Sequence, residues 1–213
     1  MPTPWNEDPA GAAPRIRRNL EGLLRKLLAE APSRVAPSVD LAREWHRSIF
    51  RGVDLPVPYF AGEVRDDDAD FPELIGYQVR VGALAGTDSR FVPEELERFE
   101  ARMRRAVGLL DPQVAVGDRP RTTGVLGSVV TLCGTAHGEW VRIHPFANGN
   151  GRTARLWANW CAVRYGLPPF VRLQPRPEGD LYGRAARDSM AGNHRAIVSL
   201  FADWLAERYR ETA

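Results

Sequence analysis

The chain has 213 residues, of which 44% are hydrophobic and 26% charged, so it can bury a core in one sizeable domain and is not globally disordered. Its 29 basic and 27 acidic residues leave a formal net charge of +2, which gives no reason to expect nucleic acid or an anionic membrane as the main partner. No stretch reaches the roughly 18 consecutive apolar residues of a membrane span, and residues 1–14 lack the pattern of a signal peptide, so we expect a cytoplasmic protein.

The first 37 residues are predicted to form an N-terminal arm with one helix. Residues 1–14 contain four prolines and a glycine, and we expect them to be irregular and poorly ordered. Residues 15–29 place isoleucine and leucine at helical spacing, with arginine and glutamate on the other face. Prolines at 32 and 37 end this helix, so we divide the chain into an arm, residues 1–37, and a main domain, residues 38–213.

The main domain is predicted to begin with a helix and a small β element. Ser38 is a suitable N-cap for a helix over residues 39–50. Residues 61–65 and 76–82 carry β-formers next to glycines and are predicted to form a hairpin-like element. Between them lies an acid cluster, residues 66–70, which fits a solvated loop or a site for a metal or a basic partner, but is a poor calcium loop.

Further helices are predicted along the rest of the chain from the spacing of their apolar residues. They cover residues 93–110, 126–140, 153–165, 181–191 and 194–210. The fold class is therefore mainly α, with one small β element. The cysteines, Cys133 and Cys161, fall in apolar segments and are expected to be buried free thiols.

A glycine-broken turn, IHPFANGNGRTAR over residues 143–155, precedes one of these helices. Glycines allow positive φ and a close approach of the backbone to a ligand, and a helix N-terminus favours phosphate. Arg152 and Arg155 are three residues apart, so both guanidinium groups can face the same anion, and His144 is suited to take a proton near neutral pH. The N–H groups that would face the anion belong to Gly149, Asn150 and Gly151. The turn predicts a polyphosphate site with a base beside it.

This turn resembles the signature of the Fic/Doc family, His-x-Phe-x-Asp/Glu-Gly-Asn-Gly-Arg-x-x-Arg, with Asn148 where the family usually has a carboxylate. The order of elements over roughly residues 38–208 is also similar to that family. The resemblance implies a Fic-like helical bundle with a β-hairpin flap, and makes residues 38–213 a Fic-like catalytic domain. In the family, the flap docks a target segment as an added strand. The flap residues expected to do so here are Val79, Arg80 and Val81.

The resemblance also implies an activity: transfer of a nucleoside monophosphate, most often AMP from ATP, to a Ser, Thr or Tyr hydroxyl of a target protein. His144 would take the proton of that hydroxyl. Gly149, Asn150 and Gly151 would bind the α- and β-phosphates. Arg152 would bind the β-phosphate and Arg155 the γ-phosphate. Tyr182 would border the pocket for the nucleotide base.

Asn148 would offer Mg²⁺, or Mn²⁺ in its place, a neutral oxygen instead of a charged one. The missing charge–charge interaction at about 4 Å is nominally about 4 kcal/mol at an effective dielectric of 20, before compensation. We therefore expect an adenylyltransferase that is slow or needs more magnesium. The alternatives are a Fic-fold nucleotide-binding module with weakened catalysis and a phosphate-transferring toxin similar to Doc.

Many relatives are restrained by a helix with the pattern Ser/Thr-x-x-x-Glu-Gly/Asn, whose glutamate pairs with the second signature arginine, here Arg155. Residues 3–8 match this pattern only in part. We therefore expect any restraint to come from a separate antitoxin-like protein.

Overall fold

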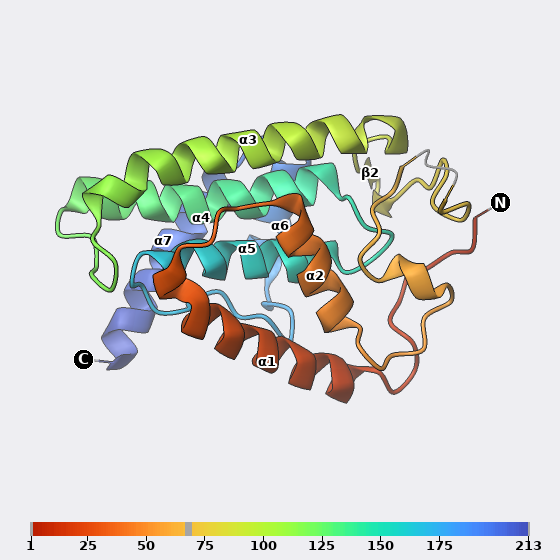
Figure 1. Cartoon of the computed structure of the whole chain (residues 1–213), viewed down its shortest axis with the longest axis horizontal. Helices are drawn as coiled ribbons and strands as arrows, with labels where there is room; N and C mark the ends of the chain where they lie inside the picture. The colour runs from red at the N-terminus through yellow and green to blue at the C-terminus, as the bar shows by residue number, and fades with distance from the viewer. Residues whose placement is uncertain (1, 67–69, 213) are drawn as a thin grey trace.

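The computed structural model describes residues 2–66 and 70–212. Over that part of the chain it contains seven α-helices and one two-stranded antiparallel sheet (Figure 1). The helices are α1 (Ala13–Glu30), α2 (Val39–Ile49), α3 (Val92–Leu110), α4 (Thr123–Ile143), α5 (Asn150–Arg164), α6 (Asp180–Met190) and α7 (Arg195–Thr212). The strands are β1 (Arg80–Val81) and β2 (Leu84–Ala85), and short 3₁₀ helices cover Ala31–Ser33, Pro58–Phe60, Ser89–Phe91 and Asp111–Gln113. The predicted fold class, mainly α with a small hairpin, is confirmed.

Helices α4 and α5 form the centre of the bundle. Helix α4 packs against α3, α5, α6 and α7, and α1 packs against α2 and α5. Figure 1 shows α3, α4 and α5 running along the long axis, with the hairpin at one end. From Thr153 to Arg164 every residue of α5 is buried, which is typical of a helix enclosed on all sides. None of the helices in the described ranges combines the length and apolarity needed to cross a membrane.

Aromatic rings join these helices close to the glycine-broken turn. Trp157 of α5 lies with its ring centroid 4.8 Å from that of Trp45 and 5.3 Å from that of Phe99. Trp140, near the end of α4, contacts Phe99 and Phe146. These rings connect α2, α3, α4 and α5, so the end of α4 and the start of α5 are held on a rigid base.

The helix predictions agree with the structure to within a few residues at each end. Ser38 caps α2 by accepting a hydrogen bond from the Leu41 N–H, as predicted, and Thr122 caps α4 in the same way through Val125. The two cysteines are buried free thiols, also as predicted. The middle of the acid cluster, residues 67–69, lies outside the described residues.

The prediction that residues 61–65 form one half of the hairpin is wrong. The hairpin is local: Arg80 pairs with Ala85 and Val81 with Leu84, around a two-residue turn in which Gly82 has a φ of +61°. A short turn with glycine at positive φ favours pairing of neighbouring segments over pairing across a long loop. Residues 61–65 run instead against the glycine-broken turn, where the Arg65 N–H donates to the Pro145 carbonyl.

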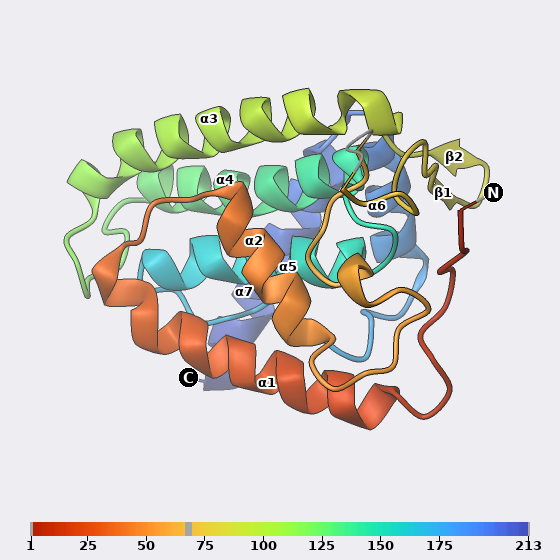
Figure 2. The same ribbon diagram turned by 45° about the vertical axis from the view of Figure 1, so that its right-hand side comes forward.

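The expectation of a poorly ordered start to the chain is also wrong for the part that the structure describes, residues 2–14. Trp5 is 2% exposed, and its ring lies 4.7 Å from Phe50 and 5.9 Å from Phe60 between centroids. Its backbone N–H donates to the Tyr77 hydroxyl. A single buried indole thus holds a backbone that has no regular secondary structure until α1. Figure 2 shows this segment running along the end of the molecule, from the start of α1 towards the hairpin.

Candidate active site

The glycine-broken turn joins α4 to α5 and is closed by the side chain of Asn150. Helix α4 ends at Ile143, and its C-cap, His144, has a left-handed backbone with a φ of +54°. The Asn150 carboxamide accepts a hydrogen bond from the Phe146 N–H at 2.9 Å and donates one to the Phe146 carbonyl at 2.8 Å. Phe146 is fully buried beneath the turn. The Asn150 side chain therefore holds the turn closed, while its backbone N–H has no acceptor among the described residues.

Gly149 fits where no other residue would. Its φ is +76°, and a Cβ there would lie 2.8 Å from His46 Nε2 and 2.9 Å from Phe50 Cε2. The turn therefore rests directly on α2, and a side chain at this position would push the two apart.

His46 supports the turn from below, a role that the sequence analysis missed. Its Nδ1 accepts a hydrogen bond from the Gly62 N–H, so Nε2 carries the proton and donates to the Asn148 carbonyl at 2.9 Å. Burial lowers the pKa of His46 to about 3 and keeps the ring neutral. The ring stacks on Phe146 at 3.8 Å between centroids. The position of His46 on the apolar face of α2 was the available signal.

The start of α5 offers backbone donors to an anion. The N–H groups of Arg152 and Thr153 bond to the Gly149 carbonyl. Within the described residues the structure shows no acceptor for the N–H groups of Asn150 and Gly151, which lie in the first turn. The Gly149 N–H is bonded to the Asn148 side-chain oxygen at 2.6 Å. Two free donors and the helix dipole make this end of α5 suited to phosphate.

His144 is set up to accept a proton. Its Nδ1 lies 2.9 Å from the Val141 carbonyl, which can only accept, so Nδ1 carries the proton and Nε2 the lone pair. Burial lowers the pKa of His144 to about 4, and the charge of Arg65 acts in the same direction. The imidazole is therefore neutral at pH 7, as a general base must be.

Arg65 links the flap to the turn and was also missed. It is fully buried and donates to the carbonyls of His144 and Tyr77 at 2.9 Å. It donates as well to the carbonyls of Thr87 at 2.8 Å and Ile143 at 3.2 Å. One guanidinium group thus holds the end of α4 against both segments that flank the hairpin.

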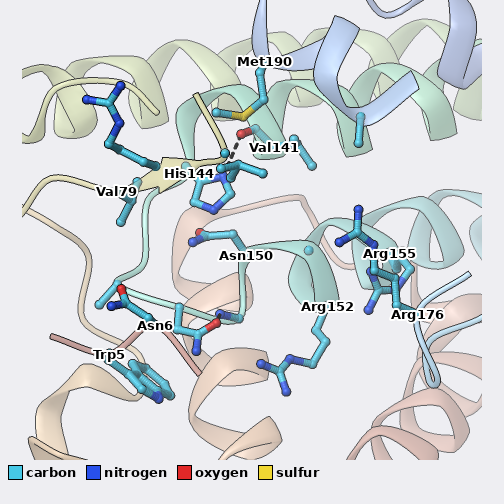
Figure 3. A pocket seen from close by; sticks show the side chains of 18 of the residues that line it. Trp5, Asn6, Val79, Val141, His144, Asn150, Arg152, Arg155, Arg176 and Met190 are labelled. Atoms are coloured by element: carbon cyan, nitrogen blue, oxygen red, sulfur yellow. Dashed lines mark hydrogen bonds between the residues drawn. The ribbon is translucent and has the colours of Figure 1, made fainter. Parts of the chain in front are cut away.

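A cavity of about 1060 Å³ opens between the turn, the flap and α6, which is large enough for a nucleoside triphosphate. All the predicted site residues line it: Val79, Arg80, Val81, His144, Asn148, Gly149, Asn150, Gly151, Arg152, Arg155 and Tyr182. In Figure 3, His144 lies between Val79 and Asn150, while Arg155 and Arg176 lie together further along the cavity. Arg176, which was not predicted, has its guanidinium carbon 5.6 Å from the centroid of the Tyr182 ring.

The two signature arginines have different partners. Arg155 is 5% exposed and donates from Nε and Nη2 to the Leu173 carbonyl and from Nη1 to the Tyr182 hydroxyl. Arg152 lies over the Phe50 ring and forms two hydrogen bonds with the Asp8 carboxylate, at 2.7 Å and 2.8 Å. Asp8 therefore binds Arg152 in the paired geometry that a phosphate would use.

A sequence model described as the Fic/DOC family matches residues 36–162, more than half of the chain. The chain belongs to the Fic/DOC family. Its curated relatives include a Caenorhabditis elegans protein, "Protein adenylyltransferase fic-1", which is 30% identical over 134 residues, 63% of this chain and 21% of that protein. The "Protein adenylyltransferase Fic" of Drosophila virilis is 36% identical over 74 residues, 35% of this chain and 15% of that protein. The chain thus spans about a fifth or less of the length of these Fic proteins.

Solved Fic structures have the same fold. That of C. elegans Fic-1 superposes with a TM-score of 0.62 at 24% identity, over 90% of this chain and 48% of that one. A BepC effector from Bartonella tribocorum with bound AMPPNP gives a TM-score of 0.59 at 17% identity, over 89% of this chain and 85% of that one.

Proposed function

We propose that this Fic protein transfers AMP from ATP to a Ser, Thr or Tyr hydroxyl of a target protein. The observation that carries the proposal is the position of His144. Its unprotonated Nε2 belongs to a cavity whose walls also hold two free helix N–H groups and two arginines of the Fic signature. The names of the adenylyltransferase relatives support this choice of nucleotide and acceptor.

The chemistry asked of these residues is positioning and charge neutralisation. His144 Nε2 takes the proton of the target hydroxyl, whose oxygen forms a bond to the α-phosphorus of ATP. The bond from that phosphorus to the bridging oxygen breaks, and pyrophosphate leaves with the electron pair. The N–H groups of Asn150 and Gly151 bind phosphate oxygens, and Arg152 and Arg155 neutralise the β- and γ-phosphates.

The target would reach this centre through the flap. Arg80 and Val81 are exposed on β1, a two-residue strand whose second edge has no strand partner within the described ranges and can take an added strand. Gly86, which directly follows β2, brings the hairpin close to the base, since a Cβ there would lie 2.8 Å from the Cβ of His144. A strand paired with β1 would thereby present its side chains to His144.

Asn148 is the residue that would hold a magnesium ion. Its side-chain oxygen accepts one hydrogen bond, from Gly149, and retains a second lone pair that fits a hard cation. When bound, Mg²⁺ or Mn²⁺ would neutralise charge on the α- and β-phosphates. Because this oxygen is neutral, we expect weak metal binding. The Asn148→Asp variant should raise transfer at low magnesium, and a fall would contradict this account.

Labelled nucleotide tests the proposal. Purified protein is incubated with cell extract and ATP labelled at the α- or the γ-phosphate, with magnesium or manganese. Retention of the α-label on protein supports adenylyl transfer, and retention of the γ-label alone would show a Doc-like phosphate transfer instead. The His144→Ala variant should abolish labelling while ATP binding stays within about twofold of wild type.

A second candidate is a Fic-fold module that binds nucleotide with weakened catalysis. Two features favour it: the neutral Asn148 and the Asp8 carboxylate on Arg152. ATP binding without transfer of either label, with both metals, would decide for it. A separate antitoxin-like inhibitor stays part of the proposal, and the assignment of residues 38–213 as the catalytic unit stays a proposal as well.

A further inference from the structure

A second histidine, His137, lies on α4 about two helical turns before His144. His137 is fully buried and is not among the residues that line the cavity. Its Nε2 lies 2.9 Å from the Tyr182 hydroxyl, and its ring packs edge-on against Phe201 of α7 and against Tyr182. The same hydroxyl lies 3.3 Å from Arg155 Nη1. Tyr182 thus stands between this histidine and the second signature arginine.

The direction of these hydrogen bonds follows from the chemistry of the groups. A guanidinium can only donate, so the Tyr182 oxygen accepts from Arg155. The Tyr182 proton is then directed to His137 Nε2, which must carry a lone pair. A neutral ring is required for this, and burial, with the charges of Arg155 and His194, lowers the pKa of His137 to about 3. The chain of donors therefore runs from Arg155 through Tyr182 to His137.

Packing alone does not account for a histidine at this position. With Nε2 as the acceptor, the proton lies on Nδ1, and Nδ1 has no hydrogen-bond partner among the described residues. Burying an unpaired donor costs free energy that an apolar side chain of similar size would avoid. What the imidazole provides is an acceptor that fixes the Tyr182 hydroxyl.

We propose that His137 is a positioning residue for the nucleotide: it orients the Tyr182 hydroxyl, which in turn fixes the Arg155 guanidinium. The inference rests on the proposed function. Arg155 has five N–H donors, and the Leu173 carbonyl and Tyr182 use three of them. One donor on each terminal nitrogen is left for a phosphate. Without the Tyr182 bond, the guanidinium could pivot about the Leu173 carbonyl, and these two remaining donors would no longer point towards the phosphate.

The test separates positioning from folding by comparing nucleotides that differ in one phosphate. Dissociation constants for ATP and ADP are measured by calorimetry, because Arg155 is assigned to the γ-phosphate that ADP lacks. His137→Leu removes the acceptor, and Tyr182→Phe removes the hydroxyl alone. Each should reduce the preference for ATP over ADP about 5-fold to 10-fold. His137→Gln keeps an acceptor at the reach of Nε2 and should retain the preference within about twofold.

His194→Gln is the matched control. His194 is another largely buried histidine, but it contacts Glu139 at 2.6 Å and not Tyr182, so its variant should leave the ATP preference unchanged. If His137→Leu does not fold, the comparison of the two single variants Tyr182→Phe and His137→Gln still tests whether the Tyr182 hydroxyl positions Arg155. An equal loss of ATP and ADP affinity, or an unchanged ratio with a lower melting temperature, would assign His137 a structural role and overturn the inference alone. Wild-type protein that binds neither nucleotide would overturn the proposed function and this inference together.

Discussion

Arg152 and Arg155 lie one turn apart on α5, yet their surroundings differ in kind. Arg155 is buried and held by two neutral acceptors, the Leu173 carbonyl and the Tyr182 hydroxyl. The side chain of Arg152 is 13% exposed and is held by the charged carboxylate of Asp8, 144 residues earlier in the chain. Neutral acceptors orient a guanidinium without cancelling its charge, whereas a carboxylate cancels it. A phosphate would thus meet a prepared cation at Arg155 and a competitor at Arg152.

Of the changes that compare the two arginines, Arg155→Lys is expected to have the largest effect. Lysine keeps the charge but lacks the planar, paired N–H donors of a guanidinium. It therefore leaves at least one buried acceptor, on Leu173 or Tyr182, without a hydrogen-bond donor. Adenylyl transfer should fall about 100-fold. The free energy of unfolding should fall by about 1–3 kcal/mol. Label transfer and urea denaturation measure the two quantities, and an effect no larger than that of Arg152→Lys would remove the distinction between the two sites.

Arg152→Lys should lower transfer about 10-fold, since it loses one paired contact to phosphate. It should leave the free energy of unfolding unchanged to within about 0.5 kcal/mol, because an ion pair with a partly exposed carboxylate contributes little. The same two assays apply. A loss of stability as large as that of Arg155→Lys would show that Asp8 is part of the fold and not a replaceable partner.

Asp8→Asn should tighten ATP binding about 3-fold, because a phosphate no longer has to displace a carboxylate from Arg152. The variant keeps the size of the side chain. Glu7→Gln removes an adjacent exposed charge and serves as the matched control, with no expected change. Calorimetry at low and high salt measures both, and the difference should shrink at high salt. Weaker ATP binding in Asp8→Asn would contradict competition and point to a role for this carboxylate with the metal.

The smallest effect is expected from pH between 6 and 8. Burial lowers the pKa of His46 and His137 to about 3 and that of His144 to about 4. The charge of Arg152 also lowers the pKa of His46, and the charge of Arg155 lowers that of His137. The base is therefore neutral across this range, and transfer should change less than about twofold. A rate that falls to half its maximum near pH 6.5 would mean that the protein does not lower the pKa of His144.

The same histidines set the response to acid. Their pKa values are lower in the folded chain than the ordinary 6.5, so the unfolded chain binds more protons between pH 6.5 and about 3. Their contribution to stability is complete above pH 6.5 and is lost as the pH falls towards 4 and 3. Thermal unfolding followed by circular dichroism should show this decline, with His137→Gln declining less steeply than wild type.

What could be predicted from the sequence is the part that depends on local pattern. Apolar spacing located the helices, and the glycine-broken turn located His144, the start of α5 and both arginines beside the cavity. The pairing of distant segments could not be predicted in this way. Asp8 reaches Arg152 because a single tryptophan, Trp5, is buried beside Phe50, and nothing in a proline-rich segment marks that contact in advance.

The hairpin shows the same limit. Its glycines correctly indicated a β element near residues 76–82. Which segment pairs with residues 80–81, however, depends on the geometry of the turn and on the contacts that the other candidate segment makes elsewhere. Residues 61–65 are used to carry Arg65 to the end of α4, and a buried arginine inside a short β-like segment cannot be distinguished from an edge residue by spacing alone. Nor does spacing reveal that the Asn150 side chain closes its own turn through the backbone of Phe146.

Arg65 has a consequence for how this protein could tolerate sequence change. Its four carbonyl bonds tie the two segments that flank the hairpin to the end of α4, where His144 lies. These bonds fix the hairpin relative to His144, so the scaffold would set the alignment between an incoming alcohol and the imidazole, whatever peptide is presented. Substitutions in the flap would then change which peptides dock there while the geometry around His144 stays the same.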